Sequence, residues 1–159
     1  MNKRIHLYGL LFVATVCQVM LMRRTAWFPD LILLIVVFAG IFHGYAEGIR
    51  LGFVAGILRG SLSVYTLPLD VFLFPAAGAL SAILAERVYR QNPVVEMVIT
   101  SFVMIATIAV HALYLKITSG NQLVGIWSVL LGSSRAVIVT IAVSPVFFFL
   151  LRGLRSQEE

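Results

Sequence analysis

Long apolar runs alternate with short polar breaks along almost the whole chain. A run of about 20 apolar residues is what an α-helix needs to cross a bilayer. The breaks are a few residues long and contain polar or charged residues such as Arg23, Arg24, Glu47 and Asn92. The pattern predicts an all-α polytopic membrane helix bundle with about six spans, formed by residues 1–159 as a single integral membrane domain. The predicted spans are Ile5–Met22, Asp30–Gly44, Gly48–Ser63, Leu67–Tyr89, Pro93–Ile117 and Gly132–Leu151.

Two of these spans carry a recognisable start signal. Asp30 follows Pro29, and a carboxylate near a helix start suits the helix dipole. Asn92 is a good N-cap residue, and Pro93 suits the first helical position. The apolar segment Gln122–Leu131 is too short to cross a bilayer, so it either lies at the outer surface or re-enters the membrane.

The composition and the charge agree with a membrane protein. Hydrophobic residues make up 60% of the chain and charged residues only 12%, whereas soluble domains have about 25% charged residues. The net charge of +5 suits Lys and Arg in cytoplasmic loops, and most of them fall on the side of the two termini, which predicts that both termini are cytoplasmic. Arg23 and Arg24 fall on the other side and argue against this orientation. Clustered basic and aromatic residues are missing, so we expect membrane lipid around the chain and no nucleic-acid partner.

Glycines recur every fourth residue through the second and third spans. They are Gly40, Gly44, Gly48, Gly52, Gly56 and Gly60. Small residues at this spacing let helix backbones approach closely in lipid. A step of four overshoots a helical turn by roughly 40°, so the ladder does not fit one stripe of one helix. The polar stretch 43–50 also interrupts it. We therefore expect two helices, each with its own GxxxG face, that fold into a tight hairpin.

Four ionisable residues map to the outer halves of their predicted spans, where burial is costly. They are Arg59, Asp70, His111 and Arg135. Arg59 and Asp70 flank the predicted loop 60–67 and could form an ion pair. They would then line an outward polar pocket or a socket for a partner. The alternative is that Arg59 snorkels to the surface and Asp70 sits in a first helical turn. We expect His111 to be an interior histidine with satisfied hydrogen bonds.

Residue patterns for catalysis or cofactor binding are missing from the sequence. The three histidines are scattered, without the Cys or carboxylate ligands that zinc prefers. No Gly-rich phosphate loop follows a strand, and no serine nucleophile motif occurs. The sequence therefore predicts a protein that is not an enzyme, with no catalytic residue, no metal site and no cofactor.

Several motifs follow one another in a characteristic order. Residues 29–34 read Pro-Asp-Leu-Ile-Leu-Leu, residues 48–58 are glycine-rich, Leu67-Pro68-Leu69 opens the next apolar span, and Asn92-Pro93 precedes another. Together they resemble the rod shape-determining protein MreD family over most of the chain. Arg59 departs from that pattern, because many members have an acidic residue at the end of the third helix.

The resemblance implies a non-enzymatic membrane scaffold of the bacterial cell-elongation (rod) complex. Such a protein is a multi-pass protein of the bacterial cytoplasmic (inner) membrane. It binds MreC, a bitopic protein, and acts with it on the peptidoglycan glycosyltransferase and transpeptidase of the elongation machinery, so that it regulates lateral wall synthesis and cell shape. On this basis we expect Trp27, Arg59 and Asp70, at the outer helix ends, to hold an MreC-like partner. The alternative for Trp27 is the aromatic belt at the membrane surface.

The same family is similar in fold to the substrate-binding subunits of energy-coupling-factor vitamin transporters. The alternative function is therefore a substrate-binding subunit of a small-molecule (vitamin) transporter, with its ligand in the outer polar pocket. The Ala-x-x-x-Ala docking motif of those subunits is absent from the first span, which has Leu7, Leu11, Thr15 and Val19 at one such spacing.

Overall fold

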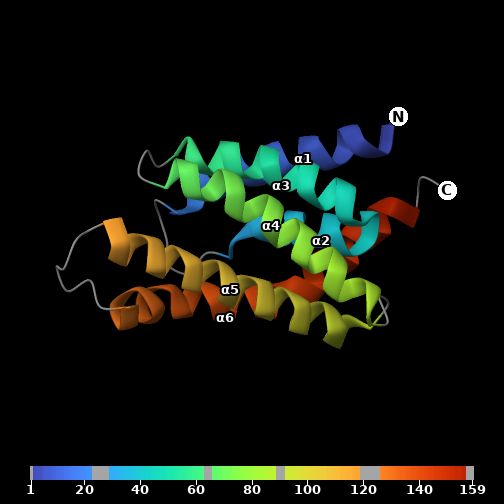
Figure 1. The fold of residues 1–159 in the computed structure, drawn as a ribbon. Coiled ribbons are helices and arrows are strands. Elements are labelled where there is room, and N and C mark those ends of the chain that lie inside the picture. The colour runs from blue at the N-terminus through green and yellow to red at the C-terminus, as the bar shows by residue number, and fades with distance from the viewer. Residues whose placement is uncertain (1, 23–28, 63–65, 89–91, 119–125, 157–159) are drawn as a thin grey trace.

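Six α-helices form the described part of the chain (Figure 1). The computed structural model describes residues 2–22, 29–62, 66–88, 92–118 and 126–156, with side chains for 7–20, 29–62, 66–88, 92–118 and 136–151. The helices are α1 (Asn2–Met22), α2 (Leu31–His43), α3 (Tyr45–Gly60), α4 (Leu67–Glu86), α5 (Pro93–Thr118) and α6 (Ile126–Ser156). No strand occurs in these ranges, which confirms the all-α prediction.

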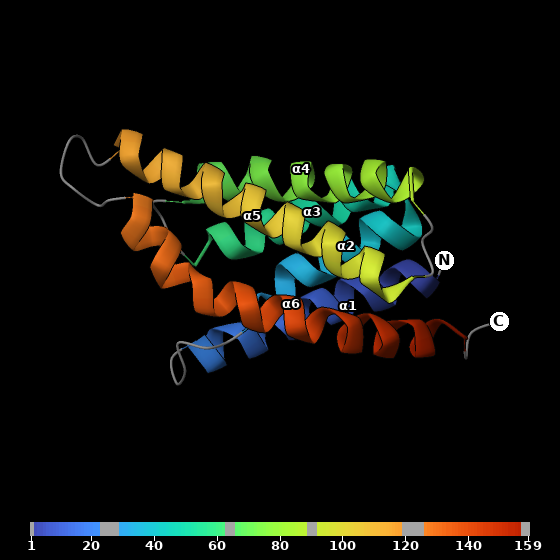
Figure 2. The same cartoon turned by 90° about the horizontal axis from the view of Figure 1, so that it is seen from below.

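Successive helices run in alternating directions, so the bundle has two distinct ends. The start of α1 and the end of α6 lie at one end, and α1, α3 and α5 finish at the other (Figures 1 and 2). The start of α2 and the start of α4 lie toward that second end as well. Side chains near the ends of α1, α3 and α5 are therefore brought together with those near the starts of α2 and α4.

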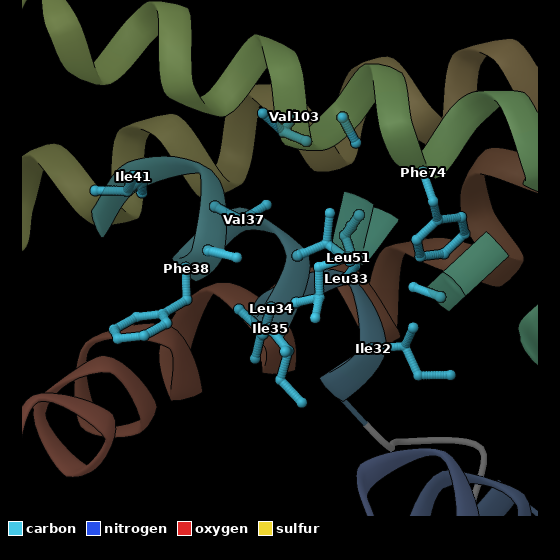
Figure 3. Close-up of a cluster of buried hydrophobic side chains, with 14 of the residues drawn as sticks. Ile32, Leu33, Leu34, Ile35, Val37, Phe38, Ile41, Leu51, Phe74 and Val103 are labelled. Carbon is cyan, nitrogen blue, oxygen red and sulfur yellow. The ribbon is translucent and has the colours of Figure 1, made fainter. Parts of the chain in front are cut away.

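Helix α2 is the centre of the bundle. It is surrounded by the other helices in both views (Figures 1 and 2), and ten consecutive residues, from Ile32 to Ile41, are buried. Its side chains point in all directions into the core, toward Leu51, Phe74 and Val103 among others (Figure 3). Phe38 also meets Phe148 of α6, with ring centroids 5.7 Å apart. A helix that is hydrophobic all round belongs in the interior, and α2 occupies that place.

The surface of the bundle is strongly apolar, and the interior contains several polar residues besides its hydrophobic core. Large apolar side chains stand on the outside, with Phe72 76% and Ile117 73% exposed. Buried polar residues are found in the interior: Thr15, Gln18, Asp70, Ser81, Glu96, Thr100, Thr107, Thr140 and Ser144. Several of the hydroxyls bond a carbonyl of the preceding turn, as Thr15 Oγ1 does to Leu11 O at 2.8 Å. Exposed apolar patches of this extent need a non-aqueous environment or a partner.

Two helices in the described residues are long and apolar enough to cross a membrane, Leu67–Glu86 and Pro93–Thr118. Among the residues with described side chains, shorter apolar helical stretches are Leu7–Met20, Leu31–His43 and Ala136–Leu151. At about 1.5 Å per residue, the 13 residues of α2 extend over roughly two thirds of a hydrocarbon core about 30 Å thick. These lengths are compatible with a membrane protein.

Most helix boundaries agree with the predicted spans to within a few residues, and one prediction is wrong. We expected the segment Gln122–Leu131 to be separate from the last span. Instead, α6 is continuous from Ile126 to Ser156, and the residues before Ile126 lie outside the described ranges. One glycine, Gly132, does not break a helix, because it costs only about 1 kcal/mol relative to Ala.

The predicted starts of α2 and α5 are confirmed by their caps. The Asp30 side chain accepts a hydrogen bond from the Leu33 backbone N–H at 3.1 Å. The Asn92 side chain accepts one from the Val94 backbone N–H at 3.0 Å. Each carboxylate or amide oxygen satisfies a donor that the first helical turn leaves unpaired.

The break between α2 and α3 is narrower than expected. The predicted spans end at Gly44 and begin again at Gly48, but His43 ends α2, Tyr45 begins α3, and Gly44 alone separates them. Gly44 has φ 86° and ψ −178°, a conformation that is essentially restricted to glycine. One residue in this conformation reverses the chain, and so the polar residues Glu47 and Arg50 lie within the first turns of α3.

The glycines of α3 run along the backbone of α4. A Cβ added at Gly48 would lie 2.7 Å from the carbonyl oxygen of Gly78, and one at Gly52 would lie 2.5 Å from that of Phe74. Gly56 faces the Asp70 carbonyl in the same way, and Gly60 faces Leu67. Four residues toward the C-terminus of α3 therefore correspond to three or four residues toward the N-terminus of α4. This is how two antiparallel helices pack when the small residues of one form a groove.

The ladder therefore has a further partner besides the one we predicted. Gly44 makes the α2–α3 hairpin turn, and a Cβ at Gly48 would lie 3.0 Å from Gly40 Cα of α2, but the glycines of α3 pack mainly on α4. Gly40 of α2 also packs on α4, where an added Cβ would collide with Ser81 and Gly78. Gly78 thus meets both α2 and α3. The sequence analysis missed Gly78, because it is the one glycine of α4 and does not belong to a repeat.

Candidate functional site

A polar cluster lies where the end of α1, the start of α2 and the end of α3 meet. Its centre is Asp30, which accepts hydrogen bonds from Gln18 Nε2 of α1 at 3.3 Å and from its own helix at Leu33. The backbone N–H of Asp30 donates to Thr140 Oγ1 of α6 at 2.9 Å. Gln18 Oε1 in turn accepts from the Ile32 backbone N–H at 3.2 Å. Asp30 therefore joins three helices through short, directional contacts.

Arg59 completes this cluster from α3. Its Nη1 donates to Asp30 Oδ2 in an ion pair, and its guanidinium lies 5.4 Å from the centre of the Phe74 ring. The Arg59 side chain is 27% exposed and the Asp30 side chain 15%. The pairing that we considered, between Arg59 and Asp70, is not formed. Asp30, at the start of the buried helix α2, forms the ion pair with Arg59 instead.

Asp70 pairs with a different helix. Its Oδ1 lies 2.9 Å from Nε2 of His111 on α5. The Asp70 side chain is only 1% exposed and that of His111 20%. The other ring nitrogen of His111, Nδ1, lies 3.2 Å from the Thr107 carbonyl oxygen. His111 is half-buried and both of its ring nitrogens have polar neighbours, but we did not anticipate its contact with Asp70.

These groups line one pocket. Its volume is about 320 Å³, and it is lined by Gln18, Val19, Ile32, Arg59, Leu62, Thr66, Asp70 and His111. Pockets for small ligands start at about this size. The lining is contributed by α1 to α5 and by the segment after α3. It combines an apolar wall with a few polar groups, which is the usual make-up of a binding pocket.

The structure places the predicted site residues unequally. Arg59 and Asp70 line the same pocket without pairing with each other, and Trp27 lies outside the described residues. The sequence analysis did not include Gln18 among site residues, although it is the only amide in the apolar part of its span. Asp30 was assigned to a helix start and not to a site. A polar residue inside an apolar run is the signal that could have found both.

No group of three or more His, Cys, Asp and Glu side chains that could hold a metal occurs in the part of the chain that the structure describes. What the cluster does offer is a set of ion pairs and hydrogen bonds that connect helices, and a cavity beside them. Comparison of the chain with family models, with curated proteins and with solved structures finds no match.

Proposed function

We propose that the protein is a non-enzymatic membrane scaffold of the bacterial cell-elongation complex. It is a multi-pass protein of the cytoplasmic membrane with about six crossings and both termini in the cytoplasm. It binds an MreC-like bitopic protein and, with that partner, regulates the glycosyltransferase and transpeptidase that build the lateral wall. The proposal rests on the resemblance to the MreD family together with the physical character of the bundle.

The observation that carries the proposal is the apolar surface of the molecule. Large apolar side chains of α1, α4, α5 and α6 face outward, whereas Arg59 pairs with Asp30, and His111 with Asp70, between helices inside the bundle. A protein of this kind presents helix faces and short loops, so it acts by contact within the membrane. The residues on which the resemblance is based also have structural roles. Asp30 and Asn92 cap helices, and the glycines of α3 allow it to pack closely on α4.

Co-purification tests the scaffold proposal. The tagged chain, extracted from its own bacterium in mild detergent, should recover an MreC-like protein and wall-synthesis enzymes, identified by mass spectrometry. Depletion of the chain should turn rods into spheres. Recovery of an ATPase with its coupling subunit, in place of wall enzymes, would contradict the scaffold and favour a transporter.

Trp27, Arg59 and Asp70 stay the predicted contact with the MreC-like partner, and the structure changes how they are tested. Asp70 is buried and Arg59 is paired within the bundle, so charge reversal at either residue will disturb the bundle as well as the partner. Trp27→Ala is the sharper variant, with Trp27→Phe as its matched control. We expect reduced recovery of the partner from Trp27→Ala alone. Full recovery from a monodisperse Trp27→Ala protein would direct attention to the opposite end, at residues 86–96.

The pocket gives one specific reason to keep the transporter subunit as a second candidate. Its 320 Å³ lies within the range of small-ligand sites. A transporter subunit should gain thermal stability from one vitamin, because a ligand that binds only the folded state stabilises it by mass action. The scaffold should gain none across a vitamin panel. One vitamin that stabilises the protein reproducibly at micromolar concentration would reverse the order of the two candidates.

A further inference from the structure

With a neutral imidazole at His111, the charges around the pocket do not balance. The positive charge of Arg59 is paired with Asp30. The second carboxylate, Asp70, faces only an imidazole among the described residues. If that imidazole is neutral, the pocket carries one uncompensated negative charge on a side chain that is 1% exposed. A buried carboxylate is costly unless a cation or several hydrogen-bond donors accompany it.

The hydrogen positions on His111 sharpen this imbalance. The carbonyl oxygen of Thr107, 3.2 Å from Nδ1, can only accept a hydrogen bond, so Nδ1 must carry the ring hydrogen. Nε2 of the neutral ring is then an acceptor, and it faces a carboxylate oxygen, which is also an acceptor. The two atoms are 2.9 Å apart, and no donor among the described residues is aligned with Asp70 Oδ1. With a neutral ring, the buried carboxylate oxygen of Asp70 and the half-buried Nε2 of His111 are two acceptors that face each other at the wall of a cavity, where a donor is missing.

We propose that this pocket binds a primary ammonium group, which donates hydrogen bonds to Asp70 Oδ1 and His111 Nε2. An ammonium has three donors and one positive charge, so it satisfies both acceptors and balances the pocket. The apolar body of the ligand would lie against Val19, Ile32 and Leu62, which line the same pocket. Arg59 is already paired, so the pocket disfavours a carboxylate. The ammonium can belong to a free amine or to an aminophospholipid headgroup.

The test uses the full chain purified in detergent and 2-phenylethylamine as the probe. Binding is measured by calorimetry and by the rise in unfolding temperature. We expect saturable binding of the amine and none of 2-phenylethanol or 3-phenylpropanoate. The trimethylammonium analogue has the charge but no N–H donor. It should bind about tenfold or more weakly, since hydrogen bonds to charged groups are worth roughly that factor or more.

Two variants connect the binding to the pocket. Asp70→Asn keeps the shape and removes the charge, and it should weaken amine binding by about tenfold or more. Val19→Phe fills the pocket without touching the polar groups and should abolish binding. Glu86→Gln makes the same carboxylate-to-amide change on an exposed residue and should bind as the wild type does. Two variants that act by different routes keep the test decisive even if one of them folds poorly.

A lipid arm distinguishes the two sources of the ammonium. Phosphatidylethanolamine in nanodiscs should compete with 2-phenylethylamine if the natural ligand is a headgroup, and phosphatidylglycerol should not. Amine binding that is unaffected by phosphatidylethanolamine assigns the site to a free amine. The proposal is overturned if the amine fails to bind at millimolar concentration, if the carboxylate binds more tightly, or if Asp70→Asn leaves amine binding unchanged. None of these outcomes depends on the scaffold function.

Discussion

Two of the interfaces of helix α4 are built in opposite ways. Against α3 its backbone lies directly on glycines, with no room for a Cβ at Gly52 or Gly56. On the side of α5 it borders a cavity, and its buried carboxylate Asp70 contacts His111 there. The two interfaces meet at one residue, because the Asp70 carbonyl faces Gly56 while its side chain faces His111.

The difference shows how the bundle combines rigidity with a polar cavity. Apolar side chains gain little by leaving lipid for a helix interface, so close van der Waals packing of backbones holds α3 to α4. That packing fixes the backbone of Asp70, and its side chain therefore has a defined position. The polar cavity can be incompletely packed because the glycine interface between α3 and α4, beside it, is closely packed. Each prediction below tests one side of this comparison.

The largest effect is expected where the backbones touch. Gly52→Leu would drive a side chain into the backbone of Phe74 and Pro75. We expect a loss at or above the upper end of the usual 1–3 kcal/mol for overpacking, seen as loss of monodisperse protein in gel filtration. Gly9→Leu is the matched control, because nothing lies within 4 Å of a Cβ at Gly9. Equal yields of the two variants would mean that α3 and α4 are not in close contact.

The turn at Gly44 should give the next largest effect, for a different reason. A Cβ at Gly44 would meet nothing within 4 Å, but φ is +86°. Gly44→Ala should therefore cost about 1–3 kcal/mol through backbone strain alone, measured as a shift in the SDS unfolding midpoint. Gly9→Ala, in the middle of α1, should cost nothing or stabilise slightly. A stable Gly44→Ala protein would mean that the α2–α3 turn has another conformation.

The polar side of the comparison is tested by a double-mutant cycle on Asp30 and Arg59. Arg59→Met leaves the partly buried Asp30 without its cation. Asp30→Asn keeps a good capping residue and removes the charge. We expect the two changes to be coupled by about 0.5–3 kcal/mol in unfolding free energy, with Arg87→Met, on an exposed residue, as a neutral control. Additive effects would show that the ion pair does not hold α2 and α3 together.

The sequence predicted the closely packed glycines better than the polar contacts around the cavity. Helix class, the Asp30 and Asn92 caps and the break near Gly44 follow from local chemistry: dihedral preference, capping and apolar run length. The partners of the long-range contacts do not follow from local chemistry. The glycine spacing predicted that helix backbones approach closely. It did not predict that α4 is the helix that packs on the glycines of α3, because Gly78 is not part of a repeat. Likewise Arg59 had two carboxylates within reach, and only the burial of α2, which brings Asp30 beside the end of α3, decides between them.

The smallest effect is expected at the other charged pair described on α3. Arg50 Nη1 lies 3.1 Å from Glu47 Oε1, one turn away, but the Arg50 side chain is 57% exposed. Exposed pairs of this kind contribute about 0–1 kcal/mol, because water screens both charges and the side chains lose freedom when they pair. Arg50→Met should thus lower the unfolding free energy by under about 0.5 kcal/mol, several-fold less than Arg59→Met on the same helix. The two substitutions remove the same side chain from the same helix, so their difference isolates burial and the bond to Asp30. If Arg50→Met costs as much as Arg59→Met, the polar cluster at the pocket is no stronger than a surface contact.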